Sequence, residues 1–335
     1  TIACPLRWIS QVNNSDEVFQ NYSFSPIVVE SLAQSNQRII VTGAGGWLGL
    51  ATLHLIANAI GEHWTERVAC FGSSHRVLTL QDGRSIIQCP LEELENLDFR
   101  PSLLLHLAFL TKDRVSEMDE AEYRSANRKL AHIVHSALNR IGVNGIFIAS
   151  SGAAYSANNN DAAHDMQVYG QLKLDDERLF NDWAESEGKT AVITRIFNVA
   201  GPYINKHQTY ALASFIRDAL AKRPIAIRAS HRVVRGFVAI RELMSLVFAL
   251  LLTDGGGIWH FDTGGEAMEL AELAEAVAIA IGPVPVERAS IQSDQTDYYV
   301  GDKQPYNLLL KKYGVQSVPL IEQIYETSQF LITAP

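Results

Sequence analysis

Short apolar runs alternate with amphipathic stretches along most of the chain. Residues 121–140 and 168–187 carry apolar positions at helical spacing, which predicts two long helices. Apolar runs with no alternation are typical of parallel strands buried on both faces. We expect such strands at residues 38–42, 68–71, 85–88, 103–109, 145–150 and 191–197. The pattern therefore predicts an α/β fold with a doubly wound parallel sheet, whose ligands lie beyond the carboxyl ends of the strands.

The pattern changes near both ends of the chain. Residues 1–35 show weak periodicity and many polar residues, so we expect an N-terminal extension that packs through Trp8, Ile9 and Phe19. Residues 36–200 hold the alternating pattern of the dinucleotide-binding type. Beyond residue 200 prolines break up shorter elements, and residues 201–335 are expected to form mainly a smaller substrate-binding lobe, with some elements returning to the first domain.

A cluster of glycines separates the first predicted strand from the first helix. In "RIIVTGAGGWLGLATLHLI" (38–56), Gly43, Gly45, Gly46 and Gly49 lie between an apolar run and an amphipathic one. Glycine inside a regular element costs about 1 kcal/mol relative to alanine, so the cluster needs a reason. A turn of this kind lets a diphosphate approach the backbone and the helix N-terminus. We therefore favour a dinucleotide site over a plain tight turn.

A second candidate site follows the strand at 145–150. Tyr169 and Lys173 are four residues apart and share one helix face, and Ser151 stands at the preceding strand end. A phenol titrates near pH ~10, and a neighbouring ammonium is expected to lower that value. The three groups together suit proton transfer to or from a carbonyl/alcohol pair. An ordinary helix surface is the alternative for the tyrosine and lysine alone.

Composition narrows the class of partner. The net charge is −9 and no run of basic residues stands out, which argues against nucleic acid or an anionic membrane as partner. The N-terminus lacks signal-peptide order and no apolar stretch is long enough to span a bilayer, so we expect a cytoplasmic protein. The cysteines Cys4, Cys70 and Cys89 fit neither a disulfide framework nor a zinc site. We expect no metal, and core positions for Cys70 and Cys89.

From about residue 38 to 320 the chain resembles the extended short-chain dehydrogenases/reductases of the nucleotide-sugar epimerase, dehydratase and reductase type. The resemblance rests on the ordered motifs "TGAGGWLG" (42–49), "LHLAF" (105–109), "SSGAAY" (150–155), "YGQLK" (169–173), "RIFNVAGPY" (195–203) and "RGFVAIREL" (235–243). It implies a Rossmann sheet, an NAD(P)-dependent oxidoreductase and a nucleotide-linked sugar as substrate.

The resemblance also implies a role for individual residues. Ser151, Tyr169 and Lys173 match the catalytic set, with Ser151 also touching the substrate. Asn127 matches a helix asparagine that supports the active site, while Asn198 and Arg235 match residues that contact the substrate diphosphate. Cofactor contacts are expected from Tyr169 and Lys173 and from Gly43, Gly46, Trp47, Leu48, Gly49, Leu107 and Ala108.

The end of the second strand points to one cofactor over another. NAD-preferring relatives carry an acid there that binds the adenosine ribose, but this chain continues with Ser73, Ser74, His75 and Arg76. Hydroxyls and a guanidinium would receive a 2′-phosphate, which an acid would repel. We therefore favour NADP(H), with NAD(H) as the alternative.

The motifs leave several reactions open. Gly152 and Ala153 follow Ser151 where a 4,6-dehydratase carries acid/base residues, which disfavours that elimination. The missing acid favours a reductase of a nucleotide-linked keto-sugar over a 4-epimerase with tightly bound NAD. A non-catalytic NADP(H)-binding regulator is a further alternative. We also expect a homodimer, because the helices at 121–140 and 168–187 carry apolar residues on more than one face, including Ile133, Val134, Leu138, Leu172, Leu179 and Phe180.

Overall fold

A large parallel sheet forms the centre of the molecule. The computed structural model describes residues 19, 21–253 and 256–333. Its sheet of eight strands has the order β11-β7-β6-β5-β1-β2-β4-β3. The strands are β1 (Arg38–Thr42), β2 (Val68–Gly72), β3 (Arg76–Thr79), β4 (Ser85–Pro90), β5 (Ser102–His106), β6 (Val143–Ser151), β7 (Thr190–Ile196) and β11 (Ile258–Asp262). The predicted α/β fold with a doubly wound parallel sheet is confirmed.

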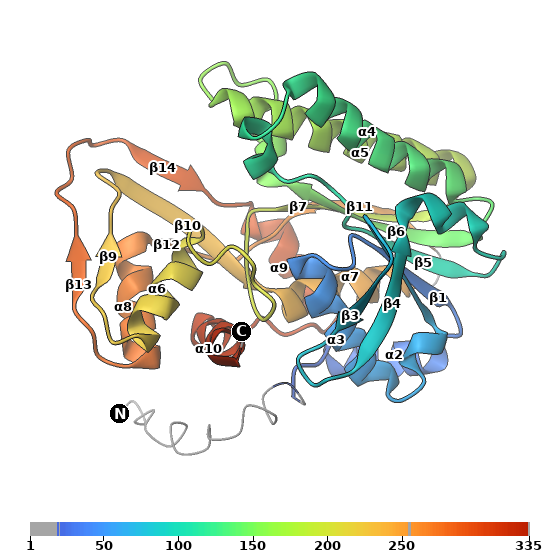
Figure 1. Ribbon diagram of the computed structural model, residues 1–335, viewed down its shortest axis with the longest axis horizontal. Coiled ribbons are helices and arrows are strands. Elements are labelled where there is room, and N and C mark those ends of the chain that lie inside the picture. The colour runs from blue at the N-terminus through green and yellow to red at the C-terminus, as the bar shows by residue number, and fades with distance from the viewer. Residues whose placement is uncertain (1–18, 20, 254–255, 334–335) are drawn as a thin grey trace.

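Helices cover both faces of this sheet (Figure 1). One face packs against α4 (Glu120–Ala137) and α5 (His164–Glu187), and the other against α2 (Pro26–Gln34), α3 (Trp47–Ile60) and α7 (Ile240–Leu251). Residues such as Ile39 and Ile40 point to opposite faces and are both fully buried. Strands buried on both sides explain why their sequence is continuously apolar rather than alternating.

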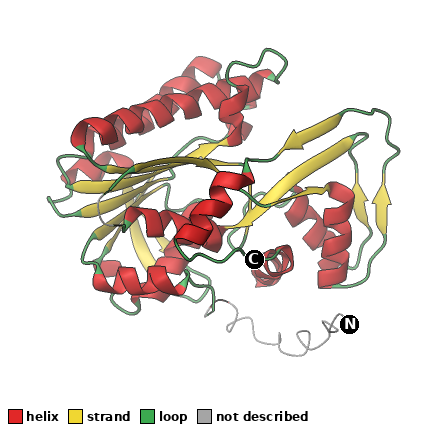
Figure 2. Ribbon diagram, turned by 180° about the vertical axis from the view of Figure 1, so that it is seen from behind, coloured by secondary structure: helices red, strands yellow, loops and turns green. Residues whose placement is uncertain are grey.

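The smaller lobe lies to one side of the sheet (Figure 2). It is built from β8 (Asn198–Ala200), β9 (Ile225–Ile227), β10 (Arg232–Ala239), β12 (Glu266–Glu269), β13 (Val286–Arg288), β14 (Thr296–Tyr299), α6 (Ala211–Leu220), α8 (Leu270–Ile281) and α10 (Leu320–Thr333). In the lobe, β10 pairs with β8, β12 and β14, while β9 pairs with β13. Helix α9 (Lys303–Lys312) connects this lobe back to the sheet, where it contacts β11.

Two elements were not expected from the sequence. Strand β3 runs antiparallel to β4 and forms the sheet edge, although no strand was predicted at residues 76–79. Helix α2 forms within the weakly periodic N-terminal segment, where Val28 and Leu32 are fully buried. Strand β11 comes from beyond residue 200 and pairs with β7, so it is an element of the second segment that returns to the large sheet.

The remaining N-terminal and cysteine predictions have mixed outcomes. Phe19 is buried and stacks on His54, whereas Trp8, Ile9 and Cys4 lie outside the described residues. Cys70 is a core thiol as expected. The same prediction is wrong for Cys89, which is only partly buried at the end of β4. In the part of the chain that the structure describes, no helix combines the length and apolar character needed to cross a membrane.

The sheet order places one ligand site. The chain order reverses between β1 and β5, because β1 is flanked by β2 on one side and β5 on the other. At such a reversal the connecting loops diverge and leave a crevice beyond the carboxyl ends of the strands. The loops that follow β1, β2, β5 and β6 therefore border this crevice.

Candidate active site

The glycine turn after β1 is packed too closely for side chains. Gly43 has φ +67°, and a Cβ on it would come within 2.6 Å of the Leu107 carbonyl carbon. A Cβ on Gly49 would lie 2.5 Å from the Ala44 oxygen. Both glycines are thus required for the turn to pack against the end of β5 and for α3 to start where it does. The turn leaves the α3 N-terminus, capped by Gly46 without a side-chain hydrogen bond, at the crevice.

A guanidinium lies directly over this turn. Arg76 begins β3, and its Nη2 atom is only 1.7 Å from where a Cβ of Gly45 would stand. Free N–H groups at a helix N-terminus and an adjacent guanidinium both favour an anionic group. Gly46 has open space beside it, since its Cβ would meet only the Gly43 oxygen at 3.2 Å. This end of the site is suited to phosphate.

Gln88 is a residue of this end that the sequence analysis missed. Its side chain is almost fully buried, accepts a hydrogen bond from Gly45 N at 3.2 Å and donates one to Ser74 O at 3.0 Å. It also fills the space beside Gly72 at the end of β2. Gln88 therefore ties the glycine turn to the loop after β2. Nothing in the sequence marked it, because it belongs to no motif and its hydrogen-bond partners lie in the turn after β1 and the loop after β2.

The other predicted cofactor residues surround the same crevice. Ser73 and Ser74 are exposed in the loop after β2. The Trp47 indole donates a hydrogen bond to Pro202 O at 2.9 Å and packs edge-on against Tyr210. Leu48 is partly buried in the first turn of α3. Leu107 and Ala108 follow β5, and both backbone N–H groups donate to Thr42 Oγ1 at 3.3 Å.

The predicted catalytic residues come together at the end of β6. Ser151 is the last residue of that strand, and Tyr169 and Lys173 lie on α5. Lys173 Nζ donates to the Ala149 carbonyl in β6 at 2.8 Å, which fixes the helix face against the strand end. Phe109, from the loop after β5, covers the lysine: its ring centroid is 3.6 Å from Nζ, and it meets Tyr169 edge-on.

The electrostatics of the tyrosine differ from the expectation. Burial raises the pKa of Tyr169, Tyr299 adds to the rise, and only the nearby Ser151 hydroxyl opposes it. Lys173 was expected to lower this pKa, but burial lowers the pKa of the lysine itself, and its Nζ lies 5.8 Å from the Tyr169 ring centroid. Desolvation of the phenol therefore outweighs the attraction of the ammonium. At neutral pH Tyr169 carries its proton.

Asn127 supports the loop that carries Phe109. It is 1% exposed on α4, accepts a hydrogen bond from Leu110 N at 2.8 Å and donates to Tyr123 O at 3.2 Å. Tyr123 in turn donates its hydroxyl hydrogen to the Leu110 carbonyl at 2.7 Å. Asn127 therefore holds the loop after β5 and touches none of the three predicted catalytic side chains through a hydrogen bond in the described chain.

The smaller lobe reaches Ser151, the predicted catalytic serine, through Tyr299. The Tyr299 hydroxyl lies 3.1 Å from Ser151 Oγ, and its carbonyl accepts a long 3.5 Å hydrogen bond from Asn198 Nδ2. Arg235 lies next to Tyr299, but its Nη2 is paired with Asp297 Oδ2 at 2.6 Å. The guanidinium expected to meet a diphosphate is thus held by a carboxylate of the same lobe. Tyr299 had no motif that could have revealed it.

A group of potential metal ligands lies at the edge of the sheet. One ligand atom each from His75, Cys89 and Glu93 lies within 4.8 Å of the others. His75 Nε2 is already hydrogen-bonded to Glu93 Oε1 at 2.9 Å; the histidine is exposed and the glutamate is half-buried. The three residues come from a loop, a strand and a 3₁₀ turn, so their spacing in the sequence did not reveal the group.

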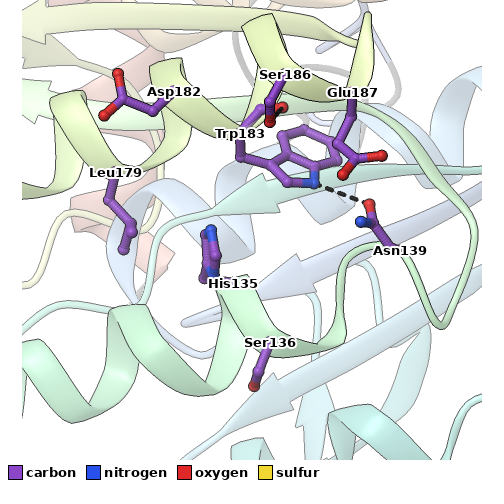
Figure 3. Close-up of a pocket in the computed structure, with 8 residues that line it drawn as sticks. All are labelled: His135, Ser136, Asn139, Leu179, Asp182, Trp183, Ser186 and Glu187. Atoms are coloured by element: carbon purple, nitrogen blue, oxygen red, sulfur yellow. Dashed lines mark hydrogen bonds between the residues drawn. The ribbon is translucent and has the colours of Figure 1, made fainter.

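A hollow on the outer surface lies between α4 and α5 (Figure 3). It is lined by His135, Ser136, Asn139, Leu179, Asp182, Trp183, Ser186 and Glu187, none of them among the predicted site residues. Trp183 Nε1 donates to Asn139 Oδ1 across it at 2.9 Å. Of the apolar residues that suggested a dimer, only Ile133 and Leu179 are partly exposed; the buried ones are Val134, Leu138, Leu172 and Phe180. The apolar character of the four buried residues is explained by packing within the subunit.

Residues 39–260 match the NAD dependent epimerase/dehydratase family. The chain belongs to this family. The resemblance found from the motifs and the assignment as an enzyme of the short-chain dehydrogenase/reductase type are confirmed. The description of the family names NAD as the cofactor, which supports a nicotinamide dinucleotide, and the preference for NADP(H) stays a prediction.

Individual members of the epimerase/dehydratase family are similar to this chain at low identity. UDP-glucuronic acid decarboxylase 5 of Arabidopsis thaliana is 22% identical over 276 residues, covering 77% of this chain and 79% of that protein. UDP-glucuronic acid decarboxylase 1 of the same plant is 28% identical over 115 residues, which are 34% of this chain and 26% of that protein.

Solved structures of similar proteins share the fold. UDP-N-acetylglucosamine 4-epimerase from Methanobrevibacter ruminantium M1, in complex with UDP-N-acetylmuramic acid, has 20% identity and a TM-score of 0.68, and the match covers 90% of this chain and 100% of that one. MoeE5 in complex with UDP-glucuronic acid and NAD has 20% identity and a TM-score of 0.65, with 89% and 100% covered.

The residues present suit the dinucleotide that the family name implies. The uncapped α3 N-terminus and Arg76 offer positive potential at the glycine turn. At the other end Lys173 has three N–H donors and makes one hydrogen bond in the described chain. Both ends therefore have unused donors for the phosphate and hydroxyl oxygens of such a group.

Proposed function

We propose that this protein reduces the carbonyl of a nucleotide-linked keto-sugar with NADP(H). The arrangement that supports the proposal is the meeting of Ser151, Tyr169 and Lys173 at the strand ends beside the glycine turn. In a reductase a bound nicotinamide supplies the hydride. The side chains of the chain itself supply the proton and the polarisation of the carbonyl.

Each of the three side chains has a distinct task in this proposal. Tyr169 is protonated at neutral pH because burial raises its pKa, so it is poised to give its proton to the substrate oxygen. Ser151 donates a hydrogen bond to the same oxygen and stabilises the charge that develops there. Lys173 holds the cofactor ribose. A protonated phenol suits the reductive direction, since an oxidation would need a base in its place.

The preference for NADP(H) rests on the other end of the crevice. The end of β2 carries no acid, and Arg76 lies over the glycine turn. We assign Ser73, Ser74 and Arg76 to the 2′-phosphate. Asn198 and Arg235 are proposed to bind the substrate diphosphate, and Arg235 must then exchange its bond with Asp297 for the ligand. We also propose a homodimer in which Ile133 and Leu179, at the α4/α5 surface, are covered.

A 4-epimerase is the second candidate. It is favoured by the solved structures with this fold, several of which are named as 4-epimerases of UDP-linked sugars. Such an enzyme oxidises and re-reduces one substrate and keeps its cofactor bound throughout. A regulator that binds NADP(H) without catalysis is a third candidate, which has no need for a proton donor at the site.

Native mass spectrometry of the purified protein separates the candidates. Retained NAD(H) would contradict the reductase and favour the epimerase. An empty protein that binds NADPH is the expected result, and it is then tested with nucleotide-linked 4-keto sugars while the nicotinamide absorbance is followed. Tight NADPH binding with no turnover of any sugar would favour the regulator.

A further inference from the structure

The hairpin of β3 and β4 presents two faces near the cofactor end of the crevice. Arg76 pairs with Gln88 across the hairpin, and both side chains reach Gly45 in the turn after β1. Cys89, the next residue of β4, points the other way because side chains alternate along a strand. His75 lies beside it, in the loop after β2. The first face is the phosphate end described above, and the second face has no assigned role.

His75, Cys89 and Glu93 meet on this second face. One ligand atom of each residue lies within 4.8 Å of the other two, and His75 Nε2 is 2.9 Å from Glu93 Oε1. The residues come from the loop after β2, from β4 and from the 3₁₀ turn Leu91–Asn96 that follows it. Three separate segments therefore bring one side chain each to the same point.

The three side chains are the ligand types that zinc prefers. Imidazole nitrogen, thiolate sulfur and carboxylate oxygen all bind Zn²⁺, whereas the thiolate disfavours the hard ions Mg²⁺ and Ca²⁺. Zinc bonds of about 2.0–2.3 Å in a tetrahedral complex separate the ligand atoms by about 3.3–3.8 Å. The observed spacing is close to this range, and His75 is exposed, so its side chain can rotate to complete the geometry.

The local charges also suit a divalent cation. A neutral imidazole, a thiolate and a carboxylate carry two negative charges together, which one Zn²⁺ balances. The neighbouring Lys129 of α4 is already 3.5 Å from Glu92. In the part of the chain that the structure describes, the Glu93 side chain has His75 as its one hydrogen-bond partner. Its carboxylate is therefore available to a metal.

A second histidine–glutamate pair shows what is special about this group. His63 Nδ1 lies 3.0 Å from Glu66 Oε1, and both side chains are exposed. No third ligand joins that pair among the described residues, where the group at Cys89 is the one set of three that lies close enough for a metal. A hydrogen-bonded pair of this kind is common at a protein surface. The half-buried thiol is what distinguishes the group on β4.

We propose that His75, Cys89 and Glu93 form a site for one Zn²⁺ ion, with water as the fourth ligand. On binding, the Cys89 thiol releases its proton to the solvent and binds as a thiolate. The neutral imidazole carries its hydrogen on Nδ1, so the metal replaces the hydrogen between Nε2 and Glu93. The ion ties the loop after β2 to the end of β4. The expectation of no metal came from the cysteine spacing alone, which could not show this group.

The test is a titration of the metal-free protein with Co²⁺, which replaces Zn²⁺ and absorbs light. A tetrahedral Co²⁺ site with a thiolate ligand gives visible absorption and a charge-transfer band in the near ultraviolet. We expect one equivalent of Co²⁺ to saturate both signals, Zn²⁺ to displace it and Mg²⁺ to have no effect. Cys89→Ser should abolish the charge-transfer band. His75→Ala and Glu93→Gln should each weaken binding about tenfold or more, since even the partners of metal ligands contribute that much.

Two variants are matched controls. His63→Ala disrupts the other histidine–glutamate pair, and Cys4→Ser removes a thiol that lies outside the described residues. Both should leave the Co²⁺ spectrum and affinity unchanged. An unmodified protein without the charge-transfer band would overturn the proposal. So would a band that persists in Cys89→Ser or disappears in Cys4→Ser.

Thermal unfolding provides a second measurement and shows whether each variant folds. A metal that binds the folded state raises Tm, so Zn²⁺ should raise it for the unmodified protein and much less for His75→Ala. This comparison decides the case even if Cys89→Ser does not fold, because His75 is exposed and its loss leaves the core intact. Equal shifts in the two proteins would contradict the site. Neither measurement needs cofactor or substrate, so both are independent of the proposed function.

Discussion

The two ends of the crevice are built in different ways. At the proposed catalytic end, Ser151, Tyr169 and Lys173 come from one strand and the helix that follows it. Hydrogen bonds from Lys173 to Ala149 O and from the Ser150 hydroxyl to Glu177 join the two elements. At the phosphate end, Gly45, Arg76 and Gln88 come from three separate segments. At one end, the spacing of residues along one strand and one helix positions the side chains proposed for proton transfer. At the other end, the groups proposed to select the cofactor meet only because segments distant in the sequence pack together.

The largest expected effect belongs to the catalytic end. Tyr169→Phe removes only the hydroxyl and should reduce the rate by about 10²–10⁴-fold, because general acid catalysis is lost. NADPH affinity should be nearly unchanged, since the ring keeps its contact with Phe109. Ser151→Ala should cost less, because the tyrosine still reaches the substrate oxygen. Steady-state rates with an active keto-sugar check both variants, and a Tyr169→Phe protein as fast as the unmodified one would refute the role.

The next effect belongs to the phosphate end. Arg76→Ala should weaken NADPH binding by about tenfold to a hundredfold with little change for NADH, because a charge-assisted hydrogen bond contributes about 1.5–3 kcal/mol. Arg84→Ala is the matched control, since Arg84 lies on the same hairpin and pairs with Asp82. Fluorescence titration with both cofactors gives the ratio. NADH binding as tight as NADPH in the unmodified protein would show that the assignment to NADP(H) is wrong.

Gln88 tests whether the phosphate end is held together as described. Gln88→Leu leaves the Gly45 N–H and the Ser74 carbonyl without their partner and should destabilise the fold by about 1–3 kcal/mol. NADPH affinity should fall as well, because the glycine turn loses its tie to the β2 loop. Urea unfolding measures the first effect. A Gln88→Leu protein with unchanged stability and affinity would mean that the turn needs no such support.

The smallest expected effect concerns the lobe that would bind the substrate. Asn198→Ala should raise KM several-fold with little change in kcat, as expected when about 1 kcal/mol of ground-state binding is removed. Asp297→Asn should act in the opposite direction, because it releases Arg235 for the substrate diphosphate. The pair of KM values provides the check. A rise in KM for Asp297→Asn would indicate that the ion pair positions Arg235 instead of withholding it.

The sequence predicted the parts of the fold that depend on local pattern. The first strand, the long helix that holds Tyr169 and Lys173, and the glycine turn could all be found because each follows from neighbouring residues. Strand β3 could not be found in this way. It is stabilised by pairing with β4 at the sheet edge, and only one of its four residues is buried, so its sequence carries no apolar run.

The parts of the site that sequence analysis missed depend on burial and on distant contacts. Tyr299 reaches Ser151 from a strand 148 residues away, and Gln88 meets Gly45 across the sheet. The sequence also led us to expect a lowered pKa for Tyr169. That expectation was wrong because residue spacing placed the lysine correctly but gave no measure of the desolvation that raises the pKa of the phenol.

The central claim is that Tyr169 protonates a keto-sugar while NADPH reduces it, and isotope transfer tests it most directly. The protein is mixed with NADPH that carries deuterium at the transferred position and with a nucleotide-linked 4-keto sugar, and the sugar product is weighed by mass spectrometry. The account predicts one deuterium in the reduced sugar, formed quickly by the unmodified protein and far more slowly by Tyr169→Phe. A sugar of inverted configuration without deuterium, formed from the corresponding alcohol while the protein keeps its own NAD, would contradict it.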